Sequence, residues 1–215
     1  MKVGTDGVLL GAWADSPNPK NILDIGTGTG LIMLMLAQRF PDSKLTGLEI
    51  NKDAFQEALQ NVSESIFMDR CRLIHSPVQE FKTTDLFDLI VSNPPFFEPS
   101  HQENTARNRA RQQSDLSFDE LLFHTKSLLT PLGKAAFIIP FASESTFLDL
   151  AKTHFLFPDK ITRVKGMKNT PVKRSLISLS QNLTDCFADE LVIEIERNVY
   201  TEEYIRLTQA FYLKM

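Results

Sequence analysis

An α/β fold with a mostly parallel sheet is predicted by the way in which apolar segments alternate along this chain. Short apolar runs that end at glycine or at a polar residue are followed by longer segments with helical spacing, as in strands joined by helices. The length of 215 residues and the apolar content of 42% supply one sizeable core. We therefore expect a single domain over residues 1–215, with helices on both faces of the sheet.

The first elements follow from apolar runs and from the residues that end them. Residues 21–25 form a short apolar run and predict a strand, and residues 31–40 predict an apolar helix that Pro41 stops. Residues 44–50 are again strand-like. Asn51 then predicts a helix N-cap, because apolar positions recur after it at helical spacing.

The alternation continues through the middle of the chain. Residues 72–75 and 87–92 predict the next two strands. Residues 117–129 predict a helix, because the segment opens with the capping box Ser-Phe-Asp-Glu and is followed by Pro-Leu-Gly. Residues 134–139 predict a strand.

The C-terminal part predicts one more helix, two strands and a closing helix. Residues 143–155 are expected to be helical, and residues 174–180 and 190–196 are expected to be strands, with antiparallel pairing at this end of the sheet. Thr201 caps a last helix that runs toward Phe211.

Neither secretion nor insertion into a membrane is predicted. The longest uninterrupted apolar stretch, 31–37, is far shorter than the about 18 residues of a membrane span, and no signal-peptide pattern opens the chain. Cys71 and Cys186 lie far apart without metal-ligand neighbours, so we expect reduced core thiols and no metal site. The expected protein is cytoplasmic, has no membrane partner, and is a monomer by default.

A basic face is predicted although the net charge of the chain is −4. Basic residues cluster in two segments, one shortly after residue 96 and one in an expected loop that ends at residue 174. These residues are Arg107, Arg109 and Arg111 in the first segment, and Lys160, Arg163, Lys165, Lys168, Lys173 and Arg174 in the second. Such a face can bind nucleic acid, and solvated surface charge is the alternative.

A ligand-binding loop is predicted where the first strand meets the first helix. Glycines at 26, 28 and 30 let the backbone turn sharply and approach a ligand, and the helix N-terminus directs its amides toward it. A dinucleotide loop needs G-x-G-x-x-G, but Leu31 stands at the position of the third glycine. The order D-x-G-x-G-x-G from Asp24 to Gly30 resembles instead the loop of the class I methyltransferases, which bind S-adenosylmethionine. A glycine-rich turn without a ligand is the alternative.

This resemblance implies a Rossmann-like fold whose mostly parallel sheet has seven strands, with an antiparallel strand near the C-terminus. Asp24 and the glycines Gly26, Gly28 and Gly30 would then form the cofactor loop. Glu49, at the tip of the second strand, can accept hydrogen bonds from both ribose hydroxyls, and Ile50 beside it is expected to contact the cofactor as well.

The adenine end of the cofactor is expected beyond the third strand. Many relatives place an aspartate there, but Pro77 stands at that position in this chain and its side chain cannot accept a hydrogen bond. Ser76, or backbone groups around Val78, are expected to take over this contact.

The run Asn93-Pro94-Pro95-Phe96 ends the fourth strand, where the substrate meets the methyl donor in this fold. It resembles the [DNS]-P-P-[YF] motif of amino-methyltransferases, which implies action on an exocyclic amine of adenine or cytosine, or on a glutamine side chain. The Asn93 side-chain oxygen and the Pro94 carbonyl can hold the two amino hydrogens, and Phe96 can stack on a base for about 1–3 kcal/mol. A structural strand terminator is the alternative.

The sequences at both ends of the chain indicate a more specific class of substrate. Residues 1–13 and 207–213 closely resemble the bacterial tRNA1(Val) adenine-N6 methyltransferases, which modify the adenine at position 37, beside the anticodon. The resemblance implies that segment 1–20 covers the cofactor site, with Thr5 and Asp6 beside the cofactor. Relatives carry about twenty residues before this segment, so we expect either a misassigned start or a missing piece that contacts the substrate.

An anticodon loop is the partner that fits this resemblance, because a single-stranded base reaches a pocket at less unstacking cost than a paired one. The two basic segments would then hold phosphates on either side of the pocket. Two alternatives stay open: a protein glutamine N5-methyltransferase, which shares the Asn-Pro-Pro-aromatic motif, and a non-catalytic RNA-binding module with the same fold.

Overall fold

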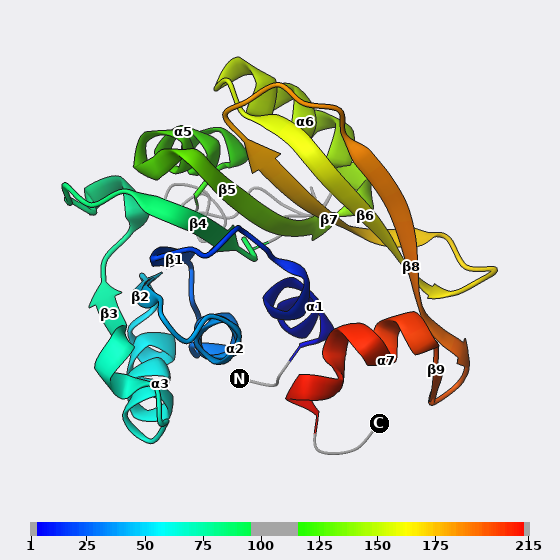
Figure 1. The fold of residues 1–215 in the computed structure, drawn as a ribbon, viewed down its shortest axis with the longest axis horizontal. Coiled ribbons are helices and arrows are strands. Elements are labelled where there is room, and N and C mark those ends of the chain that lie inside the picture. The colour runs from blue at the N-terminus through cyan, green and yellow to red at the C-terminus, as the bar shows by residue number, and fades with distance from the viewer. Residues whose placement is uncertain (1–3, 96–115, 213–215) are drawn as a thin grey trace, which may run out of the picture.

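The computed structural model describes residues 4–95 and 116–212, and within them it shows one nine-stranded sheet covered by helices on both faces (Figure 1). The strand order is β3-β2-β1-β4-β5-β7-β6-β8-β9. The strands are β1 (Asn21–Ile25), β2 (Lys44–Glu49), β3 (Cys71–His75), β4 (Phe87–Ser92), β5 (Leu129–Pro140), β6 (Phe157–Met167), β7 (Val172–Ser180), β8 (Phe187–Glu196) and β9 (Val199–Tyr200).

The first five strands are parallel to one another, and the sheet changes direction only beyond them. Strand β7 is antiparallel to both β5 and β6, β6 and β8 are parallel, and β9 is antiparallel to β8. The prediction of a mostly parallel sheet with antiparallel pairing toward the C-terminus is confirmed. The predicted number of seven strands is wrong for the described residues, because β8 and β9 extend the sheet past β6.

Six α-helices and four short 3-10 turns connect the strands in the described part of the chain. The helices are α1 (Thr5–Trp13), α2 (Leu31–Arg39), α3 (Lys52–Ser63), α5 (Phe118–Leu128), α6 (Glu144–Thr153) and α7 (Glu202–Thr208). The 3-10 turns are η1 (Met68–Arg70), η2 (Val78–Glu80), η3 (Phe141–Ser143) and η4 (Gln209–Phe211). Three predicted N-caps are confirmed, because the side chains of Asn51, Ser117 and Thr201 each accept a hydrogen bond from a backbone amide of the first turn.

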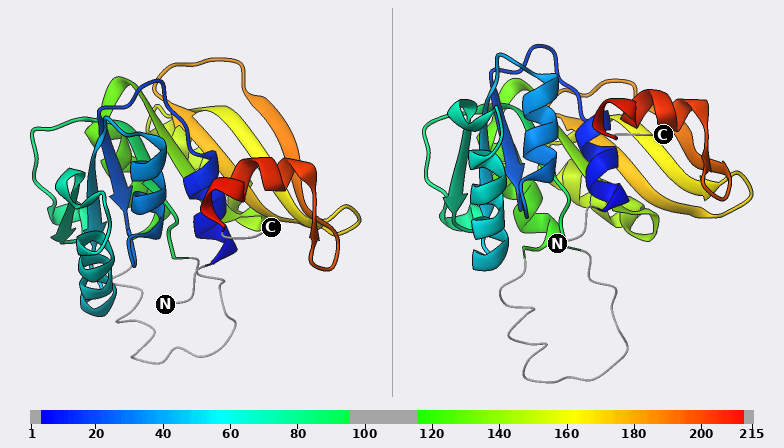
Figure 2. Two further views of the ribbon diagram at one scale, coloured as in Figure 1. Left: turned by 60° about the horizontal axis from the view of Figure 1, so that its bottom comes forward. Right: turned by 90° about the horizontal axis from the view of Figure 1, so that it is seen from below.

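Two apolar cores lie on the two faces of the sheet, because alternate residues of each strand point to opposite sides. On one face Ile22 and Leu89 pack with α1 and α2, and on the other Leu23 and Ile90 pack with α5. Figure 1 shows α5 and α6 on one side of the sheet and α1, α2 and α7 on the other. Helices α1 and α7 lie next to each other, so the two ends of the described chain meet on one face (Figure 2).

Helix α1, strands β6 and β9 and the four 3-10 turns were not predicted. Helix α1 is buried at seven of its nine positions, so it lacks the polar face that helical periodicity requires. Strand β6 covers the first half of segment 160–174, which was expected to be a basic loop. Lys168 lies in the turn that follows, and β7 contains Lys173 and Arg174. Basic side chains alternate there with buried ones such as Ile161 and Val164, which is the period of a strand.

Smaller differences concern element ends and the cysteines. Strand β5 begins at Leu129 rather than at residue 134, and α7 ends at Thr208, where η4 continues the chain. Cys186 is exposed and Cys71 is half-buried, so the prediction that both thiols are core residues is wrong. In the part of the chain that the structure describes, no helix is long and apolar enough to cross a bilayer.

Candidate active site

A cavity of about 660 Å³ opens at the carboxyl ends of β1, β2, β3 and β4. The strand order reverses between β1 and β4, and ligands of open α/β sheets bind at such a reversal. Eleven of the predicted site residues lie on the cavity wall, and these are Thr5, Asp6, Gly26, Gly28, Glu49, Ile50, Ser76, Val78, Asn93, Pro94 and Pro95. Segments far apart in the sequence therefore meet in one hollow.

The β1–α2 loop forms one wall of the cavity with its backbone. Gly26 and Gly28 have φ values of 72° and 59°, in the left-handed region that a side chain disfavours. The backbone amides of Gly26 and Thr27 both donate to the carbonyl of Leu48, at 2.9 Å, and this anchors the turn to β2. Gly30 starts α2 and does not line the cavity.

Glu49 forms hydrogen bonds within the protein in addition to the predicted contact with the ribose. Its Oε2 accepts a hydrogen bond from the amide of Gly28 at 2.8 Å, and its Oε1 accepts one from the amide of Asn51 at 2.7 Å. The side chain is only 8% exposed and lines the cavity. The carboxylate thus fixes the glycine loop, and its remaining lone pairs are available to a ligand, because an ionised carboxylate accepts about four hydrogen bonds.

Asp24 lies beneath the loop rather than on the cavity wall. It is 1% exposed, its Oδ2 accepts a hydrogen bond from the Thr27 hydroxyl at 2.6 Å, and its Oδ1 has no partner among the described residues. Burial raises the pKa of Asp24 to about 7, and the nearby charge of Glu49 adds to the rise. Asp24 therefore supports the loop from below, whereas the sequence predicted direct contact with the cofactor.

At the end of β4, Asn93 presents a buried acceptor to the cavity. Its Oδ1 has no hydrogen-bond partner among the described residues, although buried polar atoms nearly always find one. Ser92, just before it, donates from its hydroxyl to the carbonyl of Ile25 at 2.8 Å and holds β4 against β1. Pro94 and Pro95 continue the wall, and Phe96 lies outside the described residues.

The first turn of α1 closes another side of the cavity. Thr5 and Asp6 line it, as predicted, and Asp6 also accepts a hydrogen bond from Nε of Arg174 at 2.8 Å. This ion pair links α1 to β7 across 168 residues of sequence. The prediction that Arg174 binds a substrate phosphate is therefore not supported, because its guanidinium is engaged by a residue of the cavity.

The wall after β3 carries the predicted adenine contacts. Ser76 and Val78 line the cavity together with Pro77, and Gln79 adds a side-chain amide there that was not predicted. Ile50, at the end of the neighbouring strand β2, is half exposed, and its carbonyl is 3.0 Å from Nε2 of His75. Thr27, Thr29 and Leu116 also line the cavity without having been predicted. The two threonines could have been found as the variable positions of the glycine loop, whereas Leu116 gives no local signal.

Two other predicted phosphate-binding residues are paired with carboxylates. Arg163 contacts Glu144 at 2.7 Å, and Lys165 contacts Glu190 at 2.8 Å. Neither carboxylate is near its partner in the sequence, so both cations were expected to be free. The prediction that they bind phosphates of the substrate is not supported for either residue. Lys168 and Lys173 remain exposed on the β6–β7 hairpin, and the three arginines at 107, 109 and 111 lie outside the described residues.

The fold resembles that of several solved methyltransferases. A predicted O-methyltransferase from Agrobacterium tumefaciens superimposes with a TM-score of 0.74 at 16% identity, over 95% of this chain and 96% of that one. The glycopeptide N-methyltransferase MtfA, solved with S-adenosylmethionine, superimposes with a TM-score of 0.60 at 13% identity, over 85% and 90%. The fold, together with the glycine loop and the cavity at the strand reversal, is that of a class I methyltransferase.

Comparison of sequences identifies the family within this class of methyltransferases. The family model described as methyltransferase small domain matches residues 4–118. The chain is 49% identical over 220 residues to a protein of Flavobacterium johnsoniae named tRNA1(Val) (adenine(37)-N6)-methyltransferase, with coverage of 100% of this chain and 94% of the relative. A protein of Vibrio parahaemolyticus with the same name is 41% identical, with coverage of 100% and 90%. The chain belongs to the methyltransferase small domain family and, within it, to the family of these tRNA1(Val) (adenine(37)-N6)-methyltransferases.

Proposed function

We propose that this protein transfers a methyl group from S-adenosylmethionine to the exocyclic N6 of an adenine in tRNA, at position 37 beside the anticodon of a valine tRNA. The observation that carries the proposal is the Asn93 Oδ1 acceptor, which is buried, without a partner among the described residues, and on the wall of the cofactor-sized cavity. An amino group is the natural partner of such an acceptor. The names of the full-length relatives supply the tRNA and the position.

The residues of the cavity fit S-adenosylmethionine, which when bound supplies an electrophilic methyl group on a sulfonium centre. The glycine loop offers a backbone surface without side chains, as close contact with a nucleoside requires. Glu49 lines the cavity as a fixed carboxylate and would accept hydrogen bonds from the ribose hydroxyls. Thr5 and Asp6 would face the methionine end, and Ser76, Val78 and Ile50 the adenine.

Asn93 and Pro94 would bind and orient the target amino group. The amino nitrogen of adenine is a poor nucleophile, because its lone pair is delocalised into the ring. Two acceptors that hold its two hydrogens favour a pyramidal nitrogen and direct the lone pair toward the methyl group. Pro95 fixes the backbone that follows, and the ring of Phe96 would stack on the base. Acceleration then comes mainly from position and orientation.

The substrate RNA would approach from the same edge of the sheet. Strand β6 is parallel to β5, since β7 is antiparallel to both, so the turn between β6 and β7 lies at the carboxyl edge where the cavity opens. Lys168 and Lys173 are exposed on this hairpin, and Arg107, Arg109 and Arg111 follow the catalytic run in sequence. We infer that these cations bind phosphates of the anticodon loop.

Methyl transfer to a bulk bacterial tRNA fraction, followed by nucleoside analysis, tests the proposal. The expected product is N6-methyladenosine, formed only when both S-adenosylmethionine and tRNA are present. Methylglutamine formed in an added protein fraction, with no methylated nucleoside, would show a protein glutamine methyltransferase instead. Tight cofactor binding without any transfer would contradict the proposed catalysis.

A further inference from the structure

We infer that Phe141, with Lys173 beside it, forms a stacking subsite for a nucleotide of the substrate RNA next to the target adenine. This inference rests on the proposed function and adds a contact outside the cofactor cavity. Phe141 begins η3 directly after β5 and is 40% exposed. The phenylalanines of β5 and α6, Phe137 and Phe147, are fully buried, whereas Phe123, Phe155 and Phe187 are exposed elsewhere. Exposure alone does not single out Phe141. Its position does, because the ring follows the carboxyl end of β5, at the edge of the sheet where the cavity opens.

The ring lies at the right distance for a neighbouring nucleotide. Ser92 of β4 pairs with Phe137 of β5, so Asn93 is level with Ile138. Phe141 follows three residues later, which is about 10 Å further out at the rise of a strand. The residue does not line the cofactor cavity. Its ring thus lies too far out to contact a base whose amino group is bound at Asn93.

An ion pair with a buried carboxylate holds the ring from one side. The guanidinium carbon of Arg163 lies 5.9 Å from the centroid of the Phe141 ring, within the range of a cation–π contact. Arg163 is fixed in turn by Glu144, which accepts hydrogen bonds from Nε and Nη2 and is only 7% exposed. Ser175 donates a further hydrogen bond to this carboxylate. Stacking surfaces gain from such rigidity, because less side-chain entropy is lost on binding.

The negative charge of Glu144 holds Arg163 against the Phe141 ring. Burial by itself would raise the pKa of Glu144, but the hydrogen bonds from Arg163 and Ser175 and the guanidinium charge outweigh it and lower the pKa. The carboxylate therefore stays ionised and neutralises Arg163. Because Glu144 neutralises the guanidinium charge, Arg163 supports the Phe141 ring, and another cation is needed to bind the phosphate.

Lys173 is the cation that the register places beside the ring. The ladder between β5 and β7 ends at the pair Pro140 and Arg174, so the next positions are Phe141 and Lys173. Turn η3 also packs against β7. Lys173 is exposed, and its ammonium forms no ion pair among the described residues. A rigid ring beside a free cation matches a single-stranded nucleotide, which offers a base to stack and a phosphate to bind.

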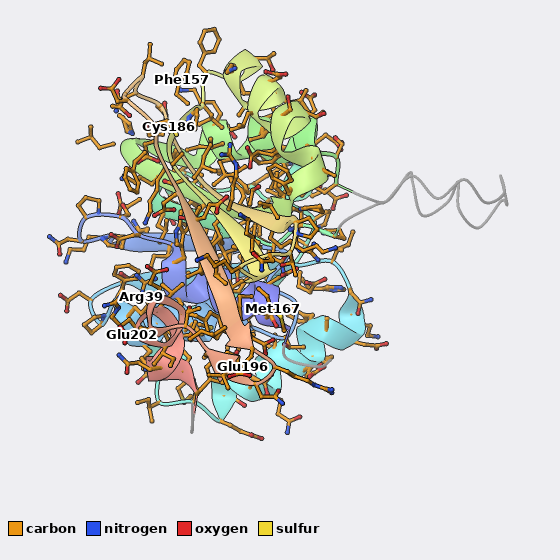
Figure 3. The ribbon with its side chains drawn as sticks, turned by 90° about the vertical axis from the view of Figure 1, so that its right-hand side faces the viewer. Arg39, Phe157, Met167, Cys186, Glu196 and Glu202 are labelled. Carbon is orange, nitrogen blue, oxygen red and sulfur yellow. The ribbon has the colours of Figure 1, made fainter. Side chains whose placement is uncertain are left out.

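Equilibrium binding of tRNA at several salt concentrations tests this subsite, with Phe141→Leu, Phe141→Trp, Lys173→Gln and the control Phe187→Ala. Phe187 is an exposed phenylalanine at the start of β8, at the opposite edge of the sheet from the hairpin. Figure 3 shows that Cys186, its sequence neighbour, and Met167 of the hairpin lie at opposite ends of these strands. The control therefore removes a ring of the same type far from the site.

Phe141→Leu should weaken tRNA binding roughly 5- to 150-fold without changing the slope of log Kd against log salt, because stacking carries no charge. Phe141→Trp should restore it, and Lys173→Gln should reduce the slope by about 0.7. Cofactor affinity should be unchanged in all four variants. Wild-type affinity in Phe141→Leu, an equal loss in Phe187→Ala, or a parallel loss of cofactor binding would overturn the subsite.

The two proposals can fail separately. Normal methylation of tRNA by both the wild type and Phe141→Leu would refute the subsite and leave the proposed function intact. A wild-type protein that binds S-adenosylmethionine but methylates no tRNA would refute the proposed function, and the subsite with it.

Discussion

Replacing Asp24 by asparagine should flatten the pH dependence of the free energy of unfolding of the ligand-free protein. Burial raises the pKa of Asp24 from its ordinary value of 3.8 to about 7, against the lowering effect of the Thr27 hydrogen bond. In the unfolded chain the same carboxyl group is deprotonated above about pH 5. Folding therefore takes up a proton between these values, and the folded state loses stability as the pH rises toward 7.

The size of the effect follows from the width of this window. One pKa unit corresponds to about 1.4 kcal/mol, so two pH units, from 5 to 7, remove about 3 kcal/mol from the wild-type protein. Asp24 is fully buried, so solvent screening does not reduce this figure. Above about pH 8, one unit beyond the folded-state pKa, the contribution of this group becomes constant. Asp24→Asn lacks it at every pH and should gain stability relative to the wild type by that amount.

Urea denaturation at pH 5, 6, 7 and 8 without cofactor measures the difference. The stability of Asp24→Asn relative to the wild type should rise by about 2–3 kcal/mol between pH 5 and 8, with little of that change above pH 7. Thr27→Val is the matched variant, because removing the hydrogen bond that lowers the pKa should extend the wild-type decline to higher pH. Parallel curves for wild type and Asp24→Asn would refute the reasoning.

Three further substitutions separate the roles of the cavity residues. Asn93→Ala should lower kcat at least about 100-fold with the cofactor Kd unchanged, as calorimetry and single-turnover kinetics would show; a weakened cofactor would contradict this role. Glu49→Ala removes two hydrogen bonds from backbone amides and should raise the cofactor Kd about 10- to 100-fold, with Glu49→Gln in between. Asp6→Asn and Arg174→Gln should each weaken cofactor binding, and the double variant should lose little more affinity than either single variant, because the two residues form one ion pair. Additive losses of affinity would show that the ion pair does not couple the two residues. An altered salt dependence of tRNA binding in Arg174→Gln would show that Arg174 contacts the RNA instead.

The cofactor loop could be predicted from the sequence because its signals are local. Gly26 and Gly28 mark a turn that needs positive φ, and Asn93 follows a run of apolar residues that ends a strand. Each of these residues is recognised together with its sequence neighbours. The strand-to-helix alternation then placed the separate motifs at one edge of the sheet.

The errors concern contacts between residues that are distant in sequence. Arg163 and Lys165 were taken as free cations, but Glu144 and Glu190 lie 19 and 25 residues away and pair with them. Asp6 and Arg174 are farther apart still, and only the packing of α1 against the sheet brings them together. Periodicity likewise missed α1, since a helix buried on nearly all sides has no polar face. Long-range pairing of charges leaves no pattern in a single sequence.

The assignment of substrate and site can be tested by methylation of a valine tRNA transcript with adenine at position 37, beside a matched transcript with guanine there. The wild-type protein should add one methyl group per tRNA to the first transcript, recovered as N6-methyladenosine, and none to the second. Asn93→Ala should give no product with either transcript while still binding the cofactor. Equal methylation of both transcripts, or methylation that survives in Asn93→Ala, would contradict the assignment of substrate and site.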